Sequence, residues 1–393
     1  MINIGSSDDE IVRFLARVKA ENPRNARLAA DLASVFASSG KIYRHTEQTA
    51  DVASTGGPSS LSTLLCPLFL RTGGLTVPKL GVPGRPAGGI DCLAQIDGYR
   101  TELDETGLVG VIRSAGYAHF LAAGRYAPLD ARVFTIRQKH GFQVVPTLVA
   151  ASLLSKKLAV GVINAGLDVR VAPHGNFGRT MDEANGNAEL FREAGELLNL
   201  VARPILTDGS QPYQPYIGRG EALVALADIF DSNADEWLNQ HLDQCRILSY
   251  DAAPEKHRPS IKSASRAELR HWFIANLEAQ GTNEKAFELK VRQIREAHTM
   301  ELVAQQDGFV RVSLEKIRHS LVNLQTTATE KSNRFPDAGG IHLKQRPGAI
   351  VSHGDILATV RLENGGDCRE FLRVMGEAIS VSQFDAHNTG ATN

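Results

Sequence analysis

The sequence predicts an α/β protein with a small helical lobe, a larger lobe built on a mixed, mainly parallel sheet, and a C-terminal α/β module. Strand-like runs at 161–172 and 201–207 flank a helical pattern at 182–200. This strand–helix–strand spacing is typical of a βαβ unit, which joins parallel strands. An apolar stretch at 127–160 and two amphipathic stretches before residue 40 indicate a separate group of helices.

The helical lobe is expected to begin with two helices, at 8–21 and 25–39. The second is expected to end at Gly40, a residue type common just after a helix. A lobe of this size has few residues with which to cover an apolar helix face. The face therefore needs a helix of the same chain or of a second subunit, and the sequence predicts a homodimer built through this lobe. The apolar face consists of Leu28, Leu32, Val35 and Phe36.

The remaining elements follow from apolar runs and from Gly and Pro positions. A helix is expected at 59–71, a short strand at 75–79 and another helix at 221–232. The charged helical stretch at 255–300 is interpreted as a solvated face or connector. Short strands and a last helix at 366–380 follow. The predicted division is a helical lobe at 1–48 with 127–160, an α/β lobe at 49–126 and 161–300, a module at 301–385 and a tail at 386–393.

Composition narrows the class of protein. The 393 residues include 43 basic and 44 acidic side chains, a formal charge of −1, which argues against a nucleic-acid partner that needs a basic excess. No apolar run approaches the ~20 residues of a membrane helix, and the N-terminus lacks a signal-peptide core. The four cysteines form no CxxC pair. We expect free thiols, no metal site and a cytoplasmic location.

The segment STGGPSSLST at 54–63 is the sharpest local signal. Two glycines, several hydroxyls and a helix start can hold an anion, because free backbone N–H groups and the positive end of the helix dipole face it. Glycine is needed where a side chain would block a phosphate. The alternative is a capped helix after a tight turn. The candidate phosphate ligands are Ser54, Thr55, Gly56, Gly57 and Thr63.

Several segments, in a conserved order, resemble the thymidine/pyrimidine-nucleoside phosphorylases, class II nucleoside phosphorylases related to anthranilate phosphoribosyltransferase. STGG matches the family's KHSTGG loop, and the match covers most of the chain. The resemblance implies no cofactor, a nucleoside or pyrimidine base as substrate and inorganic phosphate as co-substrate. The matching segments are STGG (54–57), GRPAGGIDCLAQIDGY (84–99), APLDARVFTIRQ (127–138), ASLLSKKLAVG (151–161), LDVRV (167–171), TDGSQP (207–212) and FPDAGGIHLKQRPGAIVSHGDILATV (335–360).

On the base side, the resemblance implies that Arg137, Ser152 and Lys156 hold the pyrimidine, with Phe134 flanking it. A helix puts Ser152 and Lys156 on one face, one turn apart. Arg and Lys can donate to the two carbonyl oxygens of a pyrimidine-dione, and Ser can bond its N3 edge. The cations Arg137 and Lys156 also favour the negative charge on the departing base, so they are candidate catalytic residues. The alternative is a solvent-facing lysine pair.

On the phosphate side, the match is incomplete. The family's Lys and His before STGG are replaced by Val52 and Ala53, and two further phosphate hydroxyls fall near Val82 and Ile90. A charge-assisted donor contributes about 1.5–3 kcal/mol. Loss of the lysine is therefore expected to weaken phosphate binding by one to two decades.

Candidates for replacement lie nearby. Arg85 could bind phosphate or be structural, and His140 could stand in for the missing catalytic histidine or be a surface residue. His119 is a weaker candidate of the same kind. Asp168 and Arg170 are interpreted as a structural salt bridge.

Three functions remain open. The first is pyrimidine-nucleoside phosphorylase-like pentosyl transfer, in which nucleoside and phosphate give base and pentose 1-phosphate. The second keeps the fold with another nucleophile or a phosphoribosyl donor. The third is a non-catalytic pyrimidine- or nucleoside-binding protein.

Overall fold

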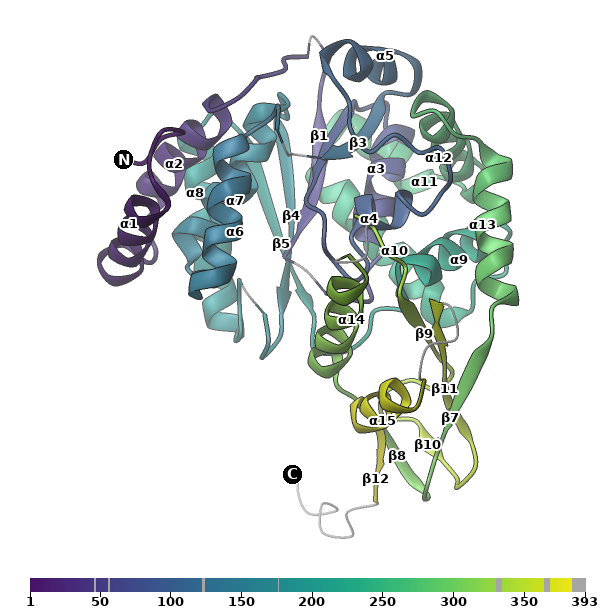
Figure 1. Ribbon diagram of the computed structural model, residues 1–393. Helices are drawn as coiled ribbons and strands as arrows, with labels where there is room; N and C mark the ends of the chain where they lie inside the picture. Colours follow the sequence, from purple (N-terminus) through teal and green to yellow (C-terminus); the bar gives the residue numbers. More distant parts are fainter. Residues whose placement is uncertain are drawn as a thin grey trace, which may run out of the picture.

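The structure is a computed structural model that describes residues 1–45, 47–55, 57–121, 124–175, 177–329, 334–363 and 368–383 (Figure 1). It is a mixed α/β fold with parallel sheets, as the sequence predicts. The helices are α1 (Asp8–Glu21), α2 (Ala26–Ser38), α3 (Ser62–Thr72), α4 (Gly89–Leu93), α5 (Glu105–Ala115), α6 (Pro128–His140), α7 (Pro146–Ala159), α8 (Met181–Leu197), α9 (Arg219–Phe230), α10 (Glu236–Ala252), α11 (Arg258–Ser263), α12 (Arg266–Ala279), α13 (Glu284–Glu296), α14 (Leu314–Thr329) and α15 (Cys368–Ala378). The strands are β1 (Ala50–Ser54), β2 (Val77–Gly81), β3 (Tyr117–Leu121), β4 (Asn164–Val171), β5 (Val201–Asp208), β6 (Tyr216–Gly218), β7 (Thr299–Val303), β8 (Gly308–Val312), β9 (Gly339–Leu343), β10 (Ile350–Val351), β11 (Ile356–Leu362) and β12 (Ile379–Ser382).

The parallel strands position the candidate site. They run in the order β5-β4-β1, and a single bridge between Thr49 and Thr76 joins β1 to the parallel pair β2-β3. The chain moves from β1 to β2 and β3 on one side, and β4 and β5 lie on the other side. The connections therefore diverge between β1 and β4, and in open α/β sheets ligands bind outside the carboxyl ends of the strands at such a point. The loop after Ser54 begins there.

The helical lobe covers its own apolar face. Leu32 and Phe36 of α2 pack in one core with Ile11 and Leu15 of α1 and with side chains of α6 and α7. Leu32 is fully buried and Phe36 is 1% exposed. The expectation that this face lacks enough chain to cover it is therefore wrong, because α1, α6 and α7 together enclose it. The homodimer stays a prediction, but the apolar face of α2 no longer supports it.

The charged helices α12 and α13 are not a connector. Leu269 and Phe273 of α12 and Phe287 and Val291 of α13 belong to the main hydrophobic core, with α3 and α9. Their charges occupy the outer faces, so a helix with a polar average composition still supplies core residues on one side. The expectation of a connector is therefore wrong, and the alternative of a solvated face applies only to the outer side of these helices.

The C-terminal module has two antiparallel sheets, in the orders β6-β9-β11-β7 and β10-β8-β12, around its own core. A buried ion pair fixes it to α9: Arg361 Nε donates to Glu221 Oε1 at 2.6 Å, and Arg361 also pairs with Asp337 at 2.9 Å. The predicted tail lies outside the described residues. The division into domains stays a prediction.

Cys66, Cys92 and Cys245 are buried free thiols. The side chain of Cys368 lies outside the described part of the chain. None of the described helices has the length and apolar character needed to cross a bilayer. Among the described residues, no three His, Cys, Asp or Glu side chains gather as metal ligands do.

Candidate functional site

The base side of the site is built on α6 and α7. Ser152 and Lys156 lie one turn apart on α7, and Lys156 Nζ donates to Ser152 Oγ at 2.9 Å and to Ser152 O at 2.6 Å. The same ammonium donates to Asp130 Oδ2 of α6 at 2.5 Å. The structure therefore brings Ser152 and Lys156 together, as their spacing predicts, and adds a carboxylate to them.

The sequence reasoning missed Asp130. It lies in the first turn of α6, and its side chain is only 3% exposed. Its second oxygen, Oδ1, is buried without a hydrogen-bond partner among the described residues. A buried acceptor without a partner is uncommon. The sequence feature that could have identified Asp130 is the acidic residue in the segment APLDAR. It lies 26 positions before Lys156, and only the packing of α6 on α7 brings the two side chains together.

Arg137 has a different set of partners. Its guanidinium donates to the carbonyl oxygens of Phe142, Gln143 and Leu148 at 3.1–3.3 Å, and burial lowers its pKa to about 10. Arg137 therefore orders the turn between α6 and α7. Five N–H groups are available on a guanidinium, so these bonds do not use all of them. Its role in base binding stays a prediction.

Arg85 and Phe134 meet across the two sides of the site. The guanidinium carbon of Arg85 lies 5.2 Å from the centre of the Phe134 ring, a cation–π contact. Arg85 belongs to the glycine-rich segment after β2, whereas Phe134 belongs to α6. The contact brings a predicted phosphate residue to a predicted base residue. His140 is exposed at the end of α6 and stacks on Phe142, with 6.4 Å between the ring centres.

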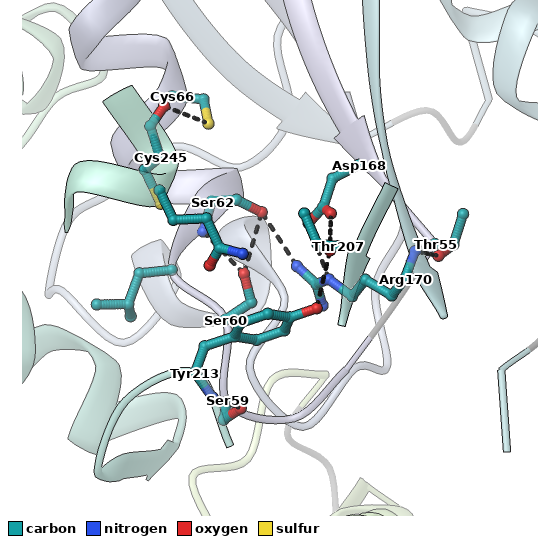
Figure 2. Close-up of polar contacts among 12 residues, drawn as sticks. Thr55, Ser59, Ser60, Ser62, Cys66, Asp168, Arg170, Thr207, Tyr213 and Cys245 are labelled. Carbon is teal, nitrogen blue, oxygen red and sulfur yellow. Dashed lines mark hydrogen bonds and ion pairs between the residues drawn. The ribbon is translucent and has the colours of Figure 1, made fainter. Parts of the chain in front are cut away.

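The loop after β1 is wrapped around Arg170 of β4 (Figure 2). Arg170 Nε donates to Asp168 Oδ2 at 2.9 Å, and Nη2 donates to Ser62 Oγ at 3.1 Å. A Cβ on Gly57, whose φ is +136°, would lie 2.5 Å from Arg170 Nη1. The predicted salt bridge between Asp168 and Arg170 is confirmed, and it occupies the loop that the sequence assigns to an anion.

The other predicted phosphate residues differ in their partners. Thr55 Oγ1 accepts the backbone N–H of Arg170 at 3.0 Å, so this hydroxyl supports the loop. Ser54 is half-buried at the end of β1. Thr63 Oγ1, in the first turn of α3, is buried and has no hydrogen-bond partner among the described residues. Gly56 lies outside the described residues.

Two lysines that the sequence reasoning did not select share one aspartate behind this loop. Lys79 Nζ of β2 donates to Asp51 Oδ1 at 2.6 Å, and Lys157 of α7 pairs with Asp51 Oδ2. All three side chains are at most 6% exposed. Burial opposes the charge of Asp51, but the two lysines lower its pKa to about 2. The trio carries one positive charge in excess.

The site thus combines two polar side chains on one face of α7, Ser152 and Lys156, with a loop rich in glycines and hydroxyls. This loop follows β1, where the connections of the parallel sheet diverge. No family model matches the chain. Among curated proteins, it is similar to the pyrimidine-nucleoside phosphorylase of Staphylococcus aureus (strain bovine RF122 / ET3-1), 26% identical over 347 residues, which are 84% of this chain and 78% of the relative. The enzyme of that name from Staphylococcus haemolyticus (strain JCSC1435) is 24% identical over 343 residues, with the same coverage.

The chain is therefore similar, as a divergent relative, to proteins named pyrimidine-nucleoside phosphorylase.

Proposed function

We propose that the protein catalyses pentosyl transfer between a pyrimidine base and phosphate. In this reaction an oxygen of phosphate forms a bond to C1′ of a nucleoside. The bond from C1′ to the base breaks, and the base keeps the electron pair. Similarity to proteins named pyrimidine-nucleoside phosphorylase supports the reaction type, and the cluster of Lys156, Ser152 and Asp130 supports the side on which the base binds.

The observation that carries the proposal is the pairing of a cation with a carboxylate whose second oxygen has no hydrogen-bond partner among the described residues. The Watson–Crick edge of uracil or thymine offers a ring N–H between two carbonyl oxygens. Lys156 can donate to a carbonyl oxygen, and the free Oδ1 of Asp130 can accept the ring N–H. Phe134 follows Asp130 by about one turn of α6, and we assign its ring to the aromatic face that flanks the base. The ammonium also stabilises the negative charge that the base acquires as it leaves.

The test is incubation with uridine or thymidine, with and without phosphate, followed by detection of free base. We expect base release that needs phosphate and that falls in Lys156→Met. Lys157→Met is the matched control, since Lys157 is the next residue of α7 but pairs with Asp51, which keeps Lys79 as a partner. Equal rates in the two variants would contradict the assignment of the base site.

A second candidate is a protein that binds pyrimidines without phosphorolysis. One observation favours it: β1 has no cation at positions 52 and 53, and Arg170 contacts the loop that follows β1. The same experiment separates the two functions. Base binding without phosphate-dependent base release would support the second candidate.

A further inference from the structure

Two polar side chains lie on one face of the sheet near the carboxyl ends of β2 and β3. Lys79 and His119 are paired positions in the parallel β2–β3 ladder, so their side chains leave the same face of the sheet. Each is two residues before the end of its strand. Both are buried, at 4% and 2% exposure. Neither belongs to the glycine-rich loop after β1.

Lys79 has donor capacity left. Its Nζ donates to Asp51 Oδ1 and to Val52 O, both at 2.6 Å. An ammonium has three N–H groups, so one remains. Lys157 already neutralises Asp51 from the other side, and the buried trio keeps a net positive charge. Burying an excess charge costs free energy unless an opposite charge approaches it.

His119 presents a neutral donor beside this lysine. The hydroxyl of Tyr117 lies 3.1 Å from His119 Nδ1, and no bond to Nε2 is made within the described part of the chain. Burial, aided by the charge of Lys79, lowers the pKa of His119 to about 3. The ring is therefore neutral at physiological pH. If Tyr117 donates to Nδ1, the proton resides on Nε2 and is available to a ligand.

Gly81, Gly89 and the hydroxyl of Thr63 lie around the Nε2–Cε1 edge of the His119 ring. A Cβ on Gly81 would lie 3.3 Å from His119 Nε2, and a Cβ on Gly89 would collide with His119 Cε1. The same added Cβ on Gly89 would lie 3.1 Å from Thr63 Oγ1. This hydroxyl is buried and has no partner among the described residues. Thr63 and His119 thus border Gly89 together, from α3 and from β3.

We propose that Lys79, His119 and Thr63 bind a tetrahedral oxyanion, the phosphate of the proposed reaction. The inference rests on that proposed function and names the residues of its anion site. An ammonium, an imidazole N–H and a hydroxyl are all donors, and together they suit an acceptor with several oxygens. The cation is supplied by β2 and the imidazole by β3, whereas positions 52 and 53 of β1 supply neither.

The experiment is titration of the whole protein with inorganic phosphate in a calorimeter, without nucleoside. We expect Lys79→Met to weaken phosphate binding about 10- to 100-fold, the loss of a charge-assisted bond. His119→Leu and Thr63→Val are expected to weaken it about 3- to 10-fold, as neutral donors do. Lys157→Met removes the excess charge of the trio but no donor to phosphate, so it is expected to weaken binding less than Lys79→Met does.

The variants in this series are chosen so that they should keep the fold. Lys79→Met leaves the pair of Asp51 with Lys157, and Thr63→Val removes a hydroxyl with no partner among the described residues, so both variants should fold. Uracil affinity, measured on the same samples, should match that of the wild type.

The outcomes separate this inference from the proposed function. Wild-type phosphate affinity in Lys79→Met, His119→Leu and Thr63→Val overturns the anion site, and so does a wild-type protein that binds no phosphate. Phosphate-dependent base release with an unchanged KM for phosphate in these variants overturns it while the proposed function stands. Lost phosphate binding in the variants, with no base release by the wild type, supports the anion site and contradicts the proposed function.

Discussion

The base side and the anion side of this protein are built in different ways. Ser152 and Lys156 occupy one face of a single helix, and one neighbour, Asp130, completes their contacts. The candidate anion residues Lys79, His119 and Thr63 come from two strands and a helix, one residue from each. A site on one helix keeps its spacing in the sequence. A site spread over several elements can change residues and keep its position in space.

The largest effect is expected from Val52→Lys, which places a cation at the family's position. Val52 is 1% exposed and belongs to the main core, beside Gly166 of β4. A lysine there would be buried without an opposite charge of its own. We expect a loss of about 3–5 kcal/mol of unfolding free energy, measured by urea denaturation. Ala53→His, at a half-buried position, is the control and should lose far less.

Lys156→Met should weaken the binding of uracil or thymine about 10- to 100-fold, because a charged hydrogen bond to the base is lost. Calorimetry with the free base measures this directly. Lys157→Met should keep wild-type affinity, since its ammonium contacts Asp51 and not the base side. An unchanged affinity in Lys156→Met would mean that α7 does not hold the base.

The pH dependence of stability tests the burial of His119. Its folded pKa is about 3, below the usual value of 6.5, so the unfolded state binds the proton more readily. Stability should therefore fall as the pH drops below 6.5. This group alone contributes a loss on the order of 2 kcal/mol between pH 7 and pH 5. Denaturation at both pH values should show a smaller loss in His119→Leu than in the wild type. The same loss in both would show that His119 is not buried as a neutral ring.

The smallest effect is expected from Gly57→Ala. Its φ of +136° disfavours any side chain, and the new Cβ would lie against Arg170 Nη1. We expect a loss of about 1–2 kcal/mol in unfolding free energy. Gly84→Ala is a matched control, because Gly84 also has a positive φ, +87°, but no atom lies within 4 Å of its added Cβ. Equal losses would indicate that backbone strain alone acts at Gly57.

The sequence predicts local features well here and spatial ones poorly. The helices around Ser152 and Lys156, the βαβ unit and the Asp168–Arg170 pair all follow from patterns within short segments. The pairing of Lys79 with His119 depends on the register of β2 and β3, which no short segment contains. The covering of α2 by α1, α6 and α7 likewise depends on how helices pack, so the apolar face of α2 gave a false reason for a dimer.

In the proposed reaction, a base held on α7 is exchanged for phosphate at C1′. Phosphorus NMR of uridine with inorganic phosphate and the wild-type protein tests it most directly, together with the amount of uracil released. We expect one pentose 1-phosphate for each uracil, at a rate that falls in Lys156→Met and not in Lys157→Met. Uracil without a sugar phosphate, or no uracil at all, would contradict it.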